Sequence, residues 1–165
     1  MMRVTVARSS GFCRGVRHAV EAAERIAADG VYVLGELVHN PLVTDEIARR
    51  GIRTVSSVEE VPAGATVILR SHGVGKAVYE ACTARGLRVE DCTCPFVKRT
   101  QKIVRRAAEE GKTIVIVGEK SHPEVVGLVG WSEGRAVVVG SGDGIGAAAL
   151  AGKEVLTASE TPCPE

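Results

Sequence analysis

Cysteine and histidine side chains recur at matched places in two stretches of the sequence. "GFCRGVRHAVEAAERIAADGVYVLGELVHNP" and "DCTCPFVKRTQKIVRRAAEEGKTIVIVGEKSHPEV" both read as a cysteine, a helical pattern, a glycine, a strand pattern, Gly-Glu and a histidine. Cys13 thereby corresponds to Cys94, and His39 to His122. Thiolates suit a soft metal centre, zinc or iron–sulfur, and imidazoles beside them suit a diphosphate or a second metal.

The same junctions between strand and helix carry the other candidate residues. His72 precedes the helical pattern "GVGKAVYE", and continuing the alignment places Ser159 at the equivalent point of the second copy. The carboxyl ends of parallel strands meet at one edge of a sheet, so we expect these side chains to share one crevice. Helix amino termini at that edge bind anions and lower the pKa of thiols. Glu124, two residues after His122, could donate protons there.

The elements that must position these residues alternate along the chain. Short β-branched runs predict strands at 4–7, 31–35, 65–70, 87–91, 113–118, 136–140 and 154–158, with helical spacing of apolar residues at 14–30, 41–51, 73–86 and 94–111. This βα alternation predicts an α/β protein with mostly parallel sheets flanked by helices. We expect two pseudo-repeated units, residues 1–93 and a truncated 94–165.

Composition excludes several classes of function. A formal net charge of +1 argues against nucleic acid as a partner, and 3% aromatic residues leave no stacking platform for single strands. There is no membrane-spanning run or signal peptide, so we expect a cytoplasmic protein. In a reducing compartment its five cysteines are expected to be thiols or metal ligands rather than disulfides.

Five segments together resemble one family. "GFCRGVRHAVEAAE", "GELVHNPLVTDEI", "RSHGV", "DCTCPFV" and "GEKSHPEVVG" are similar, in order and spacing, to motifs of the 4-hydroxy-3-methylbut-2-enyl diphosphate reductase family of the non-mevalonate isoprenoid pathway. The resemblance implies three α/β units around a central 4Fe-4S cluster, each giving one cysteine, with Cys13 and Cys94 as two of the ligands. It also implies that reductive loss of the 4-hydroxyl yields isopentenyl and dimethylallyl diphosphate.

The resemblance also implies the other roles and partners. His39, His72 and His122 would hold the substrate diphosphate, with Ser159 as a further contact, and Glu124 would deliver protons. Electrons would come from an external donor such as ferredoxin or flavodoxin. The third unit of the family would follow residue 165 and is not in this sequence, so we expect a partner chain, self-association or a longer native chain to supply it.

Alternatives remain open for the thiols. Cys163-Pro164 echoes Cys94-Pro95, which makes Cys163 a candidate third cluster ligand, although the repeat requires a helix soon after Ser159. A non-catalytic module could keep the histidines for a diphosphate without the redox centre. A small zinc site could instead combine Cys13, Cys92, Cys94 and a histidine. Otherwise Cys92 is a spare thiol, and Cys82 is expected in the core.

Overall fold

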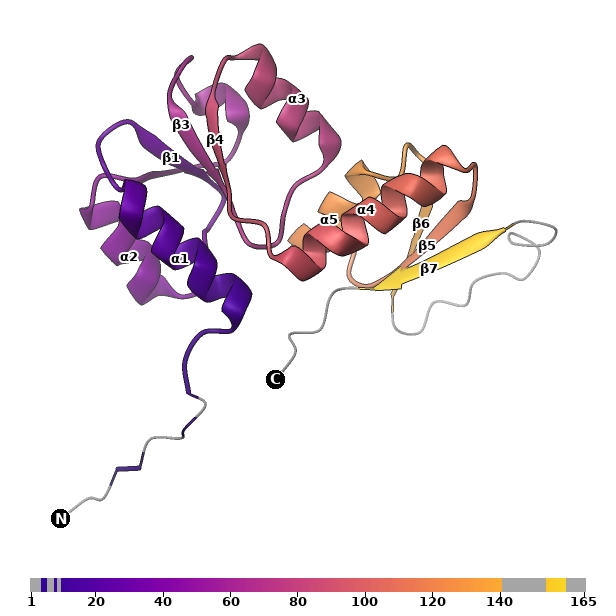
Figure 1. Ribbon diagram of the computed structural model, residues 1–165, viewed down its shortest axis with the longest axis horizontal. Coiled ribbons are helices and arrows are strands. Elements are labelled where there is room, and N and C mark those ends of the chain that lie inside the picture. Colours follow the sequence, from indigo (N-terminus) through magenta and orange to yellow (C-terminus); the bar gives the residue numbers. More distant parts are fainter. Residues whose placement is uncertain (1–3, 6–7, 9, 141–153, 160–165) are drawn as a thin grey trace.

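The computed structural model describes residues 4–5, 8, 10–140 and 154–159 of the chain. Its elements form two groups, each built on a parallel sheet (Figure 1). The first group contains α1 (Arg14–Ile26), β1 (Val31–Leu34), α2 (Pro41–Arg49), β2 (Arg53–Val55), the 3-10 helix η1 (Val58–Glu60), β3 (Thr66–Leu69), α3 (Lys76–Ala84) and β4 (Arg88–Asp91). The second contains α4 (Pro95–Glu109), β5 (Thr113–Val117), α5 (Pro123–Gly130), β6 (Ala136–Val139) and β7 (Val155–Ser159).

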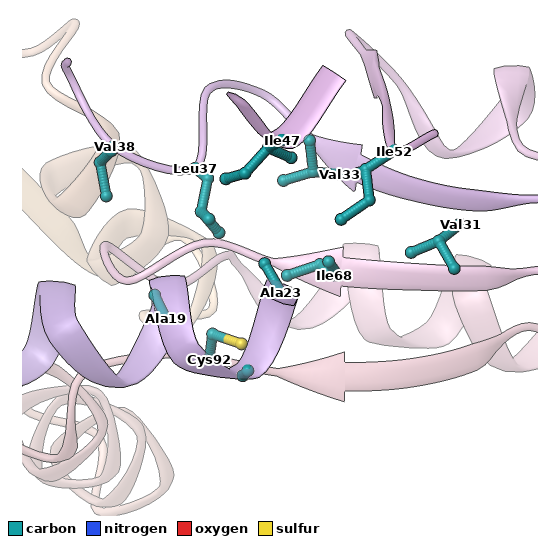
Figure 2. Close-up of a cluster of buried hydrophobic side chains, with 11 residues drawn as sticks. Ala19, Ala23, Val31, Val33, Leu37, Val38, Ile47, Ile52, Ile68 and Cys92 are labelled. Carbon is teal, nitrogen blue, oxygen red and sulfur yellow. The ribbon is translucent and has the colours of Figure 1, made fainter. Parts of the chain in front are cut away.

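The first sheet has the strand order β2-β1-β3-β4 and is covered on both faces. Alternate residues of β1 point to opposite sides: Val31 and Val33 pack with α1 and α2, while Tyr32 and Leu34 pack towards α3 and η1. Figure 2 shows the first of these clusters, in which Ala19 and Ala23 of α1 lie over the strands. Small alanines let the helix approach the sheet closely.

The second sheet has the order β6-β5-β7, and among the described elements α4 and α5 cover one of its faces. α4 and α5 pack on Ile114 and Ile116 of β5. On the opposite face Val117, Val137 and Val155 are 40%, 44% and 39% exposed. This apolar, partly exposed face corresponds to the one that α3 covers in the first sheet.

Strand pairing confirms the internal repeat and corrects one equivalence within it. β1 and β5 are the central partners of β3 and β7, respectively. Leu34 pairs with Leu69 in the first sheet, and Val117 pairs with Ser159 in the second. Leu34 and Val117 are equivalent in the repeat, because each is followed directly by a glycine. Their strand partners, Leu69 and Ser159, are therefore equivalent too. Ser159 does not correspond to His72. The sequence alignment was wrong by three residues because the two strand runs differ in composition and gave no register signal.

The predicted α/β class with parallel sheets is confirmed, and two elements differ from expectation. Val4 and Thr5 are irregular and exposed, because β propensity without a neighbouring strand to pair with forms no strand; residues 6–7 lie outside the described part. β2 was missed because it is a three-residue edge strand with only Val55 buried. The division of the chain at residues 93 and 94 stays a prediction.

Candidate functional site

Both predicted cluster cysteines lie where a helix begins. Cys13 is the N-cap residue of α1, and Cys94 is the N-cap residue of α4, whose first residue is Pro95. The two helix starts face each other, since a methyl group placed on Gly15 would lie 2.8 Å from Cys94 Sγ. Neither helix has an acidic residue in its first turn. Two positive helix ends therefore lie close together, each with a half-buried cysteine at its start.

Backbone hydrogen bonds connect the Cys94 segment to the segment that carries His72. The pairing of β3 with β4 continues beyond both strands: the Cys92 N–H donates to Leu69 O at 3.0 Å, and the Cys94 N–H donates to Ser71 O at 2.9 Å. Asp91 stabilises the same turn, because its carboxylate accepts from the Thr93 N–H at 3.0 Å. Cys94 is thus held beside the residue that precedes His72.

The three histidines predicted to bind the diphosphate are brought together. The ring centroids of His39 and His72 are 5.2 Å apart, and those of His72 and His122 are 5.7 Å apart. The rings come from the carboxyl ends of β1, β3 and β5, so residues separated by up to 83 positions meet. His72, in the middle, has a buried Nδ1 that has no hydrogen-bond partner among the described residues. A buried imidazole nitrogen of this kind is suited to a ligand.

A close backbone contact fixes α5, and with it His122, against the first unit. A methyl on Gly130 would lie 2.6 Å from the Cα of Gly75, so only glycines fit at this crossing. The carbonyl of Val74 also accepts hydrogen bonds from Trp131 Nε1 at 2.9 Å and from Gln101 Nε2 at 3.4 Å. The second unit therefore holds the loop after His72 through both α4 and α5.

Local hydrogen bonds orient the two outer histidines. His122 caps α5, and its Nδ1 accepts from the Glu124 N–H at 3.3 Å. A neutral His122 must then carry its proton on Nε2, which becomes a donor towards an anion. His39 Nδ1 lies 3.2 Å from Glu36 Oε2, where the carboxylate accepts and Nδ1 donates. Asn40 caps α2 by accepting from the Leu42 N–H, which sets the chain direction after His39.

The central histidine is held neutral. Burial lowers the pKa of His72 to about 4, and the positive charge of Arg70 and the neighbouring histidines act in the same direction. Around neutral pH His72 therefore offers an N–H donor without a positive charge. A negatively charged ligand would reverse part of this effect, because it stabilises the imidazolium.

Glu124 and Ser159 differ in their surroundings. Glu124, in the first turn of α5, is 4% exposed and lies two residues from the His122 ring, a position compatible with proton delivery into the crevice. Ser159 ends β7 beside the end of β5 and is exposed. Its role as a substrate contact stays a prediction.

The sulfur donors fit part of an iron–sulfur site. Cys13 and Cys94 have the side-chain sulfur that such clusters use as ligand. The described residues contain no group of three or more Cys, His, Asp or Glu side chains placed to hold a metal ion. The zinc alternative is disfavoured: Cys92 is 0% exposed among Ala19, Ala23 and Ile68 (Figure 2), and burial raises the pKa of its thiol to about 11. Cys163 lies outside the described residues.

Sequence reasoning placed Cys82 correctly in the core, where it is 0% exposed, and missed three supporting residues. Gly15, Glu36 and Gly130 have no chemical signature of their own. A glycine inside a helical pattern was a usable signal for close packing at Gly15 and Gly130. Glu36, three residues before His39, could have been found from the Gly-Glu shared by both repeats.

The described part of the chain contains no helix with the length and apolar character needed to cross a bilayer.

Residues 4–164 match the family model described as LytB protein. The 4-hydroxy-3-methylbut-2-enyl diphosphate reductase of Caldanaerobacter subterraneus subsp. tengcongensis is 40% identical over 85% of this chain and 51% of its own length. The reductase of the same name from an Anaeromyxobacter species is 39% identical over 98% of this chain and 58% of its own.

Solved structures agree with these sequence matches. The structure of the E-1-hydroxy-2-methyl-but-2-enyl-4-diphosphate reductase from Plasmodium falciparum has a TM-score of 0.84 at 26% identity, over 93% of this chain and 50% of that one. A structure of (E)-4-hydroxy-3-methyl-but-2-enyl diphosphate reductase has a TM-score of 0.75 at 35% identity, over 98% and 59%. The chain spans about half the length of the curated relatives it matches. By motif order, fold and family model, the chain belongs to the LytB protein family.

Proposed function

We propose that this chain forms the first two units of a 4-hydroxy-3-methylbut-2-enyl diphosphate reductase. The observation that carries the proposal is the convergence of three histidines, with ring centroids 5.2 and 5.7 Å apart, beside two cysteine-capped helix starts. His39, His72 and His122 bind the diphosphate through ring N–H groups. The buried Glu124 delivers protons near the 4-hydroxyl.

Cys13 and Cys94 would hold a 4Fe-4S cluster, which supplies electrons one at a time when bound. Each turnover takes up two electrons and two protons, breaks the C–O bond of the 4-hydroxyl and releases water, leaving isopentenyl or dimethylallyl diphosphate. The electrons come from a small redox protein of the ferredoxin or flavodoxin type. A third cysteine and the remaining substrate contacts would come from a further unit of the reductase.

Anaerobic reconstitution with iron and sulfide tests the cluster. The protein should gain visible brown absorbance and bound iron, and Cys94→Ser should lose both. Cys82→Ala is the matched control, because that thiol lies in a separate core cluster and its removal should leave the colour unchanged. Turnover is measured with a reduced dye and substrate. Colourless protein without turnover would contradict the proposal.

One observation favours a second candidate, a non-catalytic diphosphate-binding module: the three histidine rings converge without a contribution from the cysteines. Such a module should bind pyrophosphate equally well before and after Cys94→Ser and should take up no iron. The reductase proposal requires iron uptake that this substitution abolishes.

A further inference from the structure

A cavity of about 460 Å³ lies beside the histidine cluster, at the point where the strand order of the first sheet reverses. From β1 the chain goes to β2 on one side and then returns to β3 on the other. Ligands of open α/β sheets bind outside the carboxyl ends of the two strands that flank such a point. Leu34 and Gly35, at the end of β1, and Arg70, directly after β3, line the cavity.

Arg70 gives this cavity a cation that lacks a full set of partners. Its Nε is buried and makes no hydrogen bond with any described residue. The guanidinium lies over Gly35, where a methyl group would come within 2.8 Å of Nη1. Burial lowers the pKa of Arg70, although the charge of Glu36 opposes this. Because Arg70 lines the cavity, its guanidinium can donate charge-assisted hydrogen bonds to an anion bound there.

The remaining walls are mainly apolar with a few hydroxyl groups. Val58, Val74, Val78, Ala81 and Val126 are among the apolar lining residues, and Ser56 and Ser57 provide the hydroxyls. The lining also includes an acidic residue, Glu59, which is exposed to solvent. Its hydrogen bonds with its own backbone and with Ser57 lower the pKa of this carboxylate. These walls fit a small molecule with an anionic head and a short hydrocarbon body.

The cavity is separate from the histidine cluster. Its described lining contains Gly73 and Pro123, which directly follow His72 and His122 in the chain, but none of the three histidines. The two sites therefore share the loop after β3 and the start of α5 as a common wall. A ligand in one would face the other across backbone rather than occupy the same space.

We propose that this cavity is a second anion-binding site that takes a small organic phosphate with an apolar body, with Arg70 as its cation. The site goes beyond the proposed function, because it is distinct from the diphosphate position of the substrate. Only the choice of isopentenyl diphosphate as a probe rests on the proposed function, since that product belongs to the same chemical class. Inorganic pyrophosphate probes the anionic head alone.

Calorimetric titration with both probes tests the proposal on four proteins. The unaltered protein should bind two equivalents of isopentenyl diphosphate. Arg70→Met should weaken one of the two sites about tenfold or more for both probes, because a hydrogen-bonded charge is lost. Ala77→Phe, on the exposed side of α3 where it lines the cavity, should weaken isopentenyl diphosphate more than pyrophosphate. His122→Ala should remove only the other site.

Two results would overturn the inference. One is that the unaltered protein binds a single equivalent of isopentenyl diphosphate and that His122→Ala abolishes this binding. The other is that Arg70→Met and Ala77→Phe both bind two equivalents of isopentenyl diphosphate with unaltered affinity. Circular dichroism verifies the fold of each variant. Failure of the proposed function looks different, because protein without colour or turnover would still bind a probe at the Arg70 site.

Discussion

Gly15 of α1 lies in contact with the side chain of Cys94, although 79 residues separate them in the chain. The missing β-carbon at Gly15 leaves the space that the Cys94 sulfur and β-carbon occupy. This contact joins the starts of α1 and α4, two helices that can be followed in Figure 1, and it brings the two predicted cluster ligands to the same region. Several properties of the protein should depend on this junction and on the histidine cluster beside it.

Gly15→Ala should displace the Cys94 thiol. The added methyl would lie 2.8 Å from Cys94 Sγ, and overpacking of this kind costs about 1–3 kcal/mol, of which the better helix propensity of alanine offsets about 1 kcal/mol. Iron bound after reconstitution should fall sharply. Glu21→Ala, on the exposed side of the same helix, is the control and should bind iron normally. Equal iron in both variants would show that the contact does not position Cys94.

Cys92→Ser and Cys94→Ser should have opposite effects. A serine hydroxyl at the fully buried Cys92 position enters an apolar cluster and should lower the free energy of unfolding by about 1–3 kcal/mol, with iron binding retained. At the half-buried Cys94 the same change should abolish iron binding with little loss of stability. Urea denaturation and iron analysis measure the two effects. If Cys92→Ser lost iron binding while its free energy of unfolding stayed unchanged, the Cys92 thiol would be a metal ligand instead.

The stability of the protein should depend on His72 in mildly acidic solution. The folded protein binds this proton near pH 4 and the unfolded chain near pH 6.5, so the unfolded state holds more protons between these values. The free energy of unfolding should therefore fall as the pH drops from 6.5 towards 4, with no contribution from His72 above this window. Denaturation of His72→Gln should lack that slope, whereas His18→Gln, an exposed position on α1, should keep it.

Pyrophosphate should raise the pKa of His72 above its value of about 4, because the anion stabilises the protonated ring. Nuclear magnetic resonance titration of the ring protons with and without pyrophosphate measures the shift. The same titration on Cys94→Ser should give the same upward shift, since the histidines bind the anion independently of the thiol. An unchanged titration midpoint would place the anion elsewhere.

Glu124→Gln should separate binding from chemistry. The amide keeps the size of this buried side chain but cannot deliver a proton, so turnover should fall by about 10²–10⁴-fold. Pyrophosphate affinity should change little. Glu109→Gln, at an exposed position near the end of α4, is the control and should retain turnover. A parallel loss of affinity and turnover would assign Glu124 to binding instead.

Gly130→Ala should weaken pyrophosphate binding without altering a histidine. Its methyl would lie 2.6 Å from the Gly75 Cα, so α5 must shift, and His122 moves with the start of that helix. Val129→Ala, at a partly exposed neighbour on α5, removes bulk and should leave the affinity unchanged. Calorimetry compares the two variants. Equal affinities would mean that the Gly75–Gly130 crossing does not position His122.

The sequence by itself determined the α/β class and the internal repeat, and it indicated the candidate site residues. Helical and strand periodicities are local, and Cys13, Cys94, His39, His72 and His122 stand at strand-to-helix junctions that periodicity can find. Parallel strands align their carboxyl ends, so the meeting of the histidines followed from the pattern. The identity of Glu124 followed from its position after His122.

Only the tertiary structure decided the register and the close contacts. A parallel pair can shift without changing its local pattern, so Ser159 proved equivalent to Leu69 only once the pairing of β5 with β7 was known. Arg70 gained its significance from a cavity that residues distant in the chain enclose. The glycine contacts at Gly15 and Gly130 depend on how whole helices pack, and that packing is set by non-local burial rather than by any short stretch of sequence.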